Sequence, residues 1–94
     1  MAQKTVTIAV LQRDIADGRR CDPYGCPIVL AIYRRLKTDR LVVAAWRDGI
    51  NISDGRRFVV APNVKQFMID FDKGRPVRPS RFRFVVEARP LTIA

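Results

Sequence analysis

Two segments near the ends of the chain alternate apolar and polar residues with the period of a β-strand. They span residues 5–10 and 81–89. Their apolar positions are Val6, Ile8, Val10, Phe82, Phe84 and Val86. Because successive side chains of a strand point to opposite faces, this period predicts two half-buried strands. The outward positions of the last strand are Arg81, Arg83, Val85, Glu87 and Arg89, so that strand is expected to present cations to solvent.

Two other segments carry apolar residues at the spacing of an amphipathic helix. In residues 27–36 these are Ile28, Val29, Ile32 and Leu36, and Pro27 stands where a helix can begin. In residues 64–72 they are Val64, Phe67, Met68 and Phe71. Spacings of three and four place these side chains on one face of each helix. Both helices are therefore predicted to cover a sheet.

Local signals predict how the remaining helix ends are formed. A short helix over residues 11–17 is expected to end at Gly18, with that glycine in the left-handed conformation. Asn63 and Gln66 stand three apart at the start of the second main helix. This is the pattern of a capping box, which predicts Asn63 as the N-cap residue.

Between the two main helices lies a predicted meander of three short strands. The strands cover residues 41–46, 50–52 and 57–61, and two Asp-Gly pairs separate them. Asp-Gly is a strong hairpin signal because both residues tolerate a positive φ angle. The complete order predicts an α+β fold, with a small, mostly antiparallel sheet of about five strands and two main helices on one face.

Length and composition set the class of protein. A chain of 94 residues allows a single domain, 1–94, and 48% hydrophobic residues exclude a fully disordered chain. No apolar run approaches the roughly 20 residues of a membrane span, and the first residues lack the apolar core of a signal peptide. The chain has two cysteines, fewer than disulfide-stapled secreted domains usually carry. We therefore expect a cytoplasmic protein without membrane contact.

The charge of the chain indicates a polyanionic partner. Eighteen Lys and Arg residues stand against nine Asp and Glu residues, which gives a net charge of +9, and fourteen of the cations are Arg. The guanidinium fork of Arg pairs bidentately with phosphate, and nucleic acid is the commonest polyanion. The same bias also arises from a GC-rich genome, so two interpretations remain open.

The residues needed for catalysis and metal binding are scarce. The chain has no His, the commonest general base at neutral pH. Cys21 and Cys26 lack the two-residue gap of a zinc knuckle, and no further Cys or His completes four ligands. We expect no enzyme activity, no metal and no cofactor, with an Asp-based enzyme as a remote alternative. Cys26 is expected to be a buried residue at a helix start and Cys21 a loop residue, with a disulfide as the alternative.

The densest run of cations precedes the last strand. Arg75, Arg78 and Arg81 are spaced by three, and the two prolines between them favour polyproline II, which has three residues per turn. This geometry predicts three guanidinium groups along one edge, continued by Arg83 on the open face of the strand. The alternative is that each of these arginines pairs with an acidic residue of the same chain.

A second basic segment lies in the loop before the first main helix. Arg19 and Arg20 stand there close to Tyr24. The five phenylalanines are at core positions, so they are not expected to contact a ligand. Tyr24 is the aromatic residue best placed to stack on a base, ahead of Tyr33 and Trp46.

Two segments resemble a group of small proteins encoded by phages and prophages of actinobacteria. The segments are CPIVLA over residues 26–31 and FMIDFDKGRPVRP over residues 67–79. That group pairs a Cys-Pro-Val-Ala-Leu-Ala helix start with a later helix that ends in Phe-Asp-x-Gly-Arg-Pro-Val-x-Pro, and the likeness covers about two thirds of the chain. The residues at 28–30 depart slightly from it. The resemblance implies a phage accessory protein of the host cytoplasm, and no catalytic activity.

These observations predict a non-catalytic, phage-type protein that binds an anionic macromolecule. The expected partner is nucleic acid or a ribonucleoprotein. The expected contact residues are Arg19, Arg20, Tyr24, Arg75, Arg78, Arg81 and Arg83. The alternative is a protein that docks on a host or defence enzyme and inhibits it. The two differ in salt dependence, because phosphate neutralisation releases counterions and a shape-driven protein interface does not.

Overall fold

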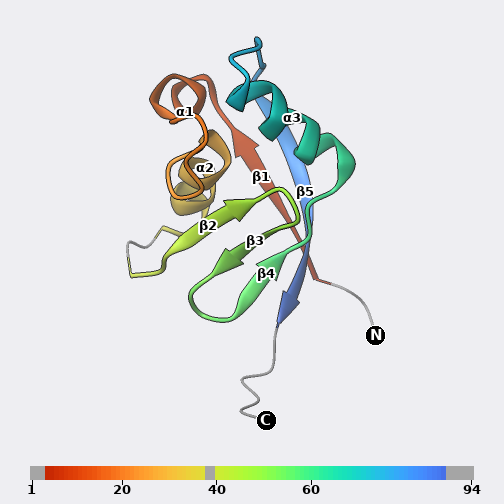
Figure 1. Ribbon diagram of the computed structural model, residues 1–94. Helices are drawn as coiled ribbons and strands as arrows, with labels where there is room; N and C mark the ends of the chain where they lie inside the picture. The colour runs from red at the N-terminus through yellow and green to blue at the C-terminus, as the bar shows by residue number, and fades with distance from the viewer. Residues whose placement is uncertain (1–3, 38–39, 89–94) are drawn as a thin grey trace.

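The computed structural model describes residues 4–37 and 40–88 and contains the elements in the predicted order (Figure 1). The strands are β1 (Lys4–Val10), β2 (Val43–Trp46), β3 (Gly49–Ile52), β4 (Arg56–Phe58) and β5 (Ser80–Ala88). The helices are α1 (Gln12–Asp17), α2 (Pro27–Leu36) and α3 (Pro62–Asp72). All strand pairs are antiparallel, so the predicted α+β fold with a five-stranded sheet is confirmed.

The strand order is β1-β5-β4-β3-β2, which places the last strand of the chain next to the first. Strand β5 lies between β1 and β4, and Ile8 of β1 stands opposite Phe82. The predicted inward positions of both strands therefore face the same core. Arg89, expected at the end of this strand, lies outside the described residues.

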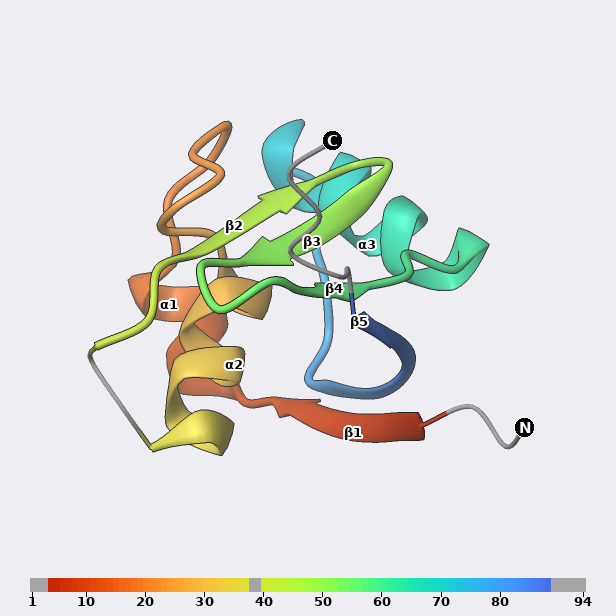
Figure 2. The same ribbon diagram turned by 90° about the horizontal axis from the view of Figure 1, so that it is seen from below.

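Helix α2 lies between the two edges of the sheet (Figure 2). The hydroxyl of Tyr33 accepts a hydrogen bond of 3.0 Å from the backbone N–H of Val43 on β2. The next residue, Arg34, donates from Nη2 to the carbonyl of Ala9 on β1 at 2.7 Å. Two consecutive side chains of α2 thus form hydrogen bonds with the backbones of the two edge strands, one with β2 and the other with β1. Since α2 contacts both β1 and β2, the two edge strands of the sheet, the sheet must curl around this helix.

The core is a single cluster shared by the strands, α2 and α3. Phe58 and Phe84 stack at its centre with ring centroids 5.5 Å apart, and Phe67 of α3 meets Phe82 edge-on at 5.3 Å. The predicted apolar face of α3 is buried, whereas Lys65 on the opposite side is exposed. This confirms the helical phase expected from the sequence. No helix formed by residues 4–37 and 40–88 is long and apolar enough to cross a membrane.

The predicted capping box of α3 is wrong. The helix begins at Pro62, its N-cap is Ala61, and no side chain caps it. Proline suits the first position of a helix because the N–H that it lacks has no partner there. Gln66 does not reach back to Asn63, and its Nε2 donates instead to Asp70 Oδ1 at 2.9 Å.

The predicted left-handed conformation of Gly18 is also wrong. Its φ is −68° and its ψ is 151°, which any residue can adopt. The reason for glycine is space, because a Cβ there would lie 2.6 Å from the ring of Pro27 and 2.9 Å from the carbonyl oxygen of Asp14. Gly18 thus allows the end of α1 to contact the start of α2.

Two of the three meander strands, β2 and β4, are shorter than predicted, whereas β3 is one residue longer because it begins at Gly49. Strand β2 begins at Val43, because the N–H of Val42 bonds the hydroxyl of Ser53 and no backbone carbonyl. Strand β4 ends at Phe58, four residues before Pro62 begins α3 and the chain turns away from the sheet. The two Asp-Gly turns stand between the strands as expected.

Candidate nucleic-acid interface

The open face of β5 carries two exposed arginines, Arg81 and Arg83. They alternate with the buried Phe82 and Phe84, so their side chains leave the sheet on the side opposite the core. Arg83 stands opposite Thr7 of β1. Within residues 4–37 and 40–88, no acidic side chain forms an ion pair with either arginine. Both guanidinium groups are therefore available to a phosphate.

Strand β4 adds a third cation to this open face, which the sequence analysis missed. Arg57 is opposite Glu87 of β5 and alternates with the buried Phe58, and that alternation is the signal that could have revealed it. Its Nη2 donates to the carbonyl of Asp48 at 2.7 Å, and its guanidinium lies against Gly49. Arg57 is thus partly engaged within the protein.

The two arginines of the segment between α3 and β5, Arg75 and Arg78, differ in their contacts, so the predicted row does not form as a whole. Arg75 pairs with Asp70 through Nη1 and Oδ1 at 3.1 Å, and its backbone N–H bonds the carbonyl of the same residue at 2.8 Å. The alternative expected from the sequence, an internal acidic partner, therefore holds for Arg75, although its side chain remains exposed. Arg78 is exposed, and no ion pair joins it to any residue in the described ranges.

Arg19 and Arg20, the two arginines of the loop before α2, contact different parts of the protein. The guanidinium of Arg20 lies against Gly74, with Nη1 3.0 Å from the position that a Cβ would occupy there. This contact places the guanidinium of Arg20 at the end of α3, at the residue that precedes Arg75. Arg19 instead crosses Gly25 and lines a shallow hollow with the exposed Tyr24. The lining of that hollow also includes Arg13 and the carboxylates of Asp14, Asp17 and Asp22, so acidic side chains outnumber the two cations there.

A hydrogen bond from the N–H of Cys21 to Asp72 Oδ1, 2.9 Å long, attaches this loop to α3. The loop and the end of α3 lie side by side in both views (Figures 1 and 2). Sequence spacing gave no sign of this contact because the two residues are 51 positions apart.

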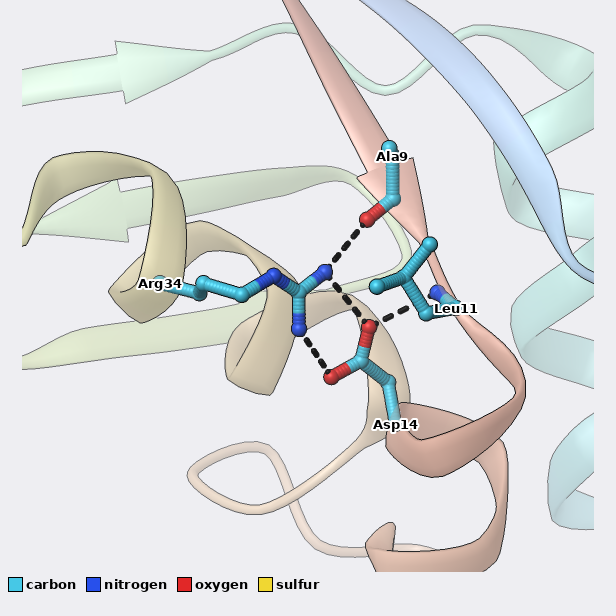
Figure 3. A network of polar contacts seen from close by, with 4 residues as sticks. All are labelled: Ala9, Leu11, Asp14 and Arg34. Carbon is cyan, nitrogen blue, oxygen red and sulfur yellow. Dashed lines mark hydrogen bonds and ion pairs between the residues drawn. The ribbon is translucent and has the colours of Figure 1, made fainter.

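Among the ion pairs of the described residues, the pair of Asp14 and Arg34 is the most buried (Figure 3). The guanidinium binds both carboxylate oxygens, at 2.6 and 2.8 Å, and the N–H of Leu11 donates to Asp14 Oδ2 at 2.8 Å. Burial by itself would raise the pKa of Asp14. The hydrogen bonds from Arg34 and Leu11 and the charges of Arg34 and Arg13 outweigh burial, so the pKa lies below the ordinary value of 3.8. The hydrogen bond to Asp14 raises the pKa of Arg34 above its ordinary value.

Asp14 has both oxygens bound by donors of its own chain, whereas Asp17 is exposed. In the parts of the chain that the structure describes, no three Cys, Asp or Glu side chains gather into a possible metal site.

Both cysteines are free, with Cys26 buried at the N-cap of α2 and Cys21 exposed in the loop. Burial raises the pKa of the Cys26 thiol, and this effect outweighs the backbone N–H groups of Ile28 and Val29, which lower it. We expect the double variant Cys21→Ser, Cys26→Ala to lose only about 1 kcal/mol of unfolding free energy, because it removes one buried sulfur. Thermal unfolding of both proteins measures this loss. Unfolding of the wild type by a chelator or a reductant would contradict the expectation.

The exposed cations thus form separate groups. One group, which we call the β5 arginine row, consists of Arg78 just before β5 and of Arg81 and Arg83 on the open face of that strand. Arg20 and Arg75 are both at the end of α3, where Arg20 lies against Gly74 and Arg75 pairs with Asp70, while Arg19 and Tyr24 line the hollow. Comparison of the chain with protein-family models, curated proteins and solved structures finds no match.

Proposed function

We propose that the protein binds nucleic acid, free or within a ribonucleoprotein, through the β5 arginine row, without catalysing a reaction. The observation that carries this proposal is the exposed position of Arg78, Arg81 and Arg83, for which the described residues provide no acidic partner. An arginine that is not neutralised by its own protein gains most from a phosphate, because the new pair replaces no existing one.

The surroundings of the row also suit a phosphate backbone. Residues two apart on a strand are roughly 6.8 Å apart, so Arg81 and Arg83 project in parallel from a rigid element. Thr5 and Thr7 on the neighbouring strand are exposed on the same face and offer hydroxyl donors. The net charge of +9 adds long-range attraction for a polyanion. Among the described residues, the exposed aromatic side chains are those of Tyr24 and Trp46, which belong to other parts of the surface, so contact with the phosphate backbone is favoured over base stacking.

The test is the salt dependence of binding to a labelled single-stranded oligonucleotide. The variant Arg78→Gln, Arg81→Gln, Arg83→Gln should fold normally, because surface substitutions usually change stability by no more than about 0.5 kcal/mol each. Log affinity falls as log salt rises, and loss of three phosphate contacts should make this negative slope shallower by about 2. Affinity at low salt should fall roughly tenfold or more. Fluorescence anisotropy across a salt series measures both quantities.

A matched control removes the same charge elsewhere. The variant Arg35→Gln, Lys37→Gln, Lys65→Gln changes three exposed cations on the helices and leaves the open face intact. It should retain a slope near that of the wild type. Equal losses in the two variants would show that only total charge matters, and the absence of wild-type binding at physiological salt, about 0.15 M, would refute the proposal.

A further inference from the structure

An apolar groove of about 440 Å³ opens on a part of the surface distinct from the β5 arginine row. Three segments build it: the start of α2 with the preceding loop, the end of β2 with its turn, and one face of α3. Its floor includes Phe67, Met68 and Phe71 of α3. A volume of this size lies within the range of ligand-binding clefts.

The groove is the place where the core is open to solvent. Most buried apolar residues are at most 5% exposed, but five of them are 7–9% exposed. These five are Cys26, Ala45, Phe67, Met68 and Phe71, and all of them line the groove. Trp46 stands at its rim with 45% of its surface exposed. Apolar surface gathered in one hollow is typical of an interaction site.

The rim of the groove has a net negative charge, opposite in sign to the net charge of the chain. It carries Asp22, Asp48 and Asp72 with a single cation, Arg47, a local charge of −2 on a chain of net charge +9. Arg47 and Asp72 are 3.8 Å apart, and the Cys21 N–H also binds Asp72. In the stretches 4–37 and 40–88, no ion pair involves the carboxylate of Asp22 or Asp48, and Arg57 binds only the backbone carbonyl of Asp48.

We propose that this groove binds a short segment of a partner protein that carries an aromatic side chain next to a Lys or Arg. The aromatic side chain would cover Phe67, Phe71 and the exposed face of Trp46. The adjacent cation would lie near Asp22 and Asp48, and also within reach of the Trp46 ring for a cation–π contact. The carboxylates disfavour a nucleotide in the same place, because they repel its phosphates. This proposal stands independently of the β5 arginine row.

The test uses two peptides that differ in one charge. They are acetyl-Ser-Gly-Trp-Lys-Gly-Ser-amide and the same peptide with Glu in place of Lys, titrated into ¹⁵N-labelled protein and followed by NMR chemical shifts. The Lys peptide should shift the resonances of Trp46, Phe67 and Phe71 and bind roughly tenfold more tightly than the Glu peptide. Asp48→Asn should reduce that preference about threefold, and Trp46→Ala should weaken both peptides about tenfold.

Two matched variants test the specificity. Asp17→Asn removes an exposed carboxylate outside this groove, and Val59→Ala truncates an exposed apolar residue on another surface. Both should bind the peptides as the wild type does. Equal affinity for the two peptides, shifts that map outside the groove, or no saturation at millimolar peptide would overturn the proposal. Self-association abolished by Trp46→Ala would overturn it in favour of a second copy, and oligonucleotide shifts within the groove would overturn it in favour of nucleic acid.

Discussion

Truncation of Phe84 to alanine is expected to lower the free energy of unfolding by roughly 3–5 kcal/mol, the usual cost of deleting a buried aromatic ring. Phe84 has no exposed surface, and its ring contacts those of Phe58 and Phe82 at centroid distances of 5.5 and 6.5 Å. Domains of this length are stable by about 5–15 kcal/mol in total, so little net stability would remain. The midpoint of thermal unfolding should fall by on the order of 12 °C or more.

The neighbouring Val85 provides the control for this experiment. It lies on the open face of β5 and is only half-buried, so Val85→Ala should cost less than about 1 kcal/mol. Urea unfolding of the two variants gives both free energies directly. If Val85→Ala were as damaging as Phe84→Ala, the assignment of inward and outward positions on β5 would be incorrect.

Replacement of Arg34 by glutamine is expected to cost about 3 kcal/mol, the lower end of the range for a broken buried ion pair. The lower end applies because the Arg34 side chain is 32% exposed, whereas that of its partner Asp14 is 5% exposed. The substitution leaves a buried carboxylate without its cation and removes the bond to the Ala9 carbonyl. It therefore also loosens α2 from the edge of β1. Urea unfolding at pH 7 measures the loss.

The same pair gives a defined dependence of stability on pH. The pKa of Asp14 in the folded state lies below its ordinary value of 3.8, so the unfolded state binds the proton more readily. The stabilisation is complete well above pH 3.8 and is lost as the pH falls through the folded-state pKa. The difference in unfolding free energy between the wild type and Asp14→Asn should therefore shrink as the pH is lowered from 7 to 3.

An exposed ion pair of the same chain serves as the comparison for Arg34. Arg56 binds Asp54 at 2.7 Å on the surface, and both side chains are about one third exposed. Arg56→Gln should cost less than about 1 kcal/mol, because water screens the pair. Similar losses in Arg34→Gln and Arg56→Gln would mean that the network in Figure 3 does not hold α2 against β1.

Periodicity along the chain was enough to predict the order of the elements and the buried faces of β5 and α3. Phe82 and Phe84 alternate with arginines, and Phe67 and Phe71 recur at helical spacing, so each pattern can be recognised within one element. The exposure of Arg78, Arg81 and Arg83 followed from the same alternation and from the prolines before the strand. Short-range signals at helix ends were less successful. Helix α3 begins at Pro62, so Asn63 is not the N-cap residue that its spacing from Gln66 predicted. Gly18 is required by its close contact with Pro27 and not by a left-handed conformation.

Contacts between distant segments came only from the tertiary structure. Spacing cannot distinguish an arginine that is free for a phosphate from one that is bound within the protein. Arg34 is held by Asp14 and Ala9, and Arg75 by Asp70, while Arg20 reaches Gly74 across more than 50 residues. The groove likewise needs α2, β2 and α3 to meet, and its acidic rim is hidden in a sequence of net charge +9. Side chains of the same type acquire different roles because tertiary packing sets both the burial of each and its nearest opposite charge.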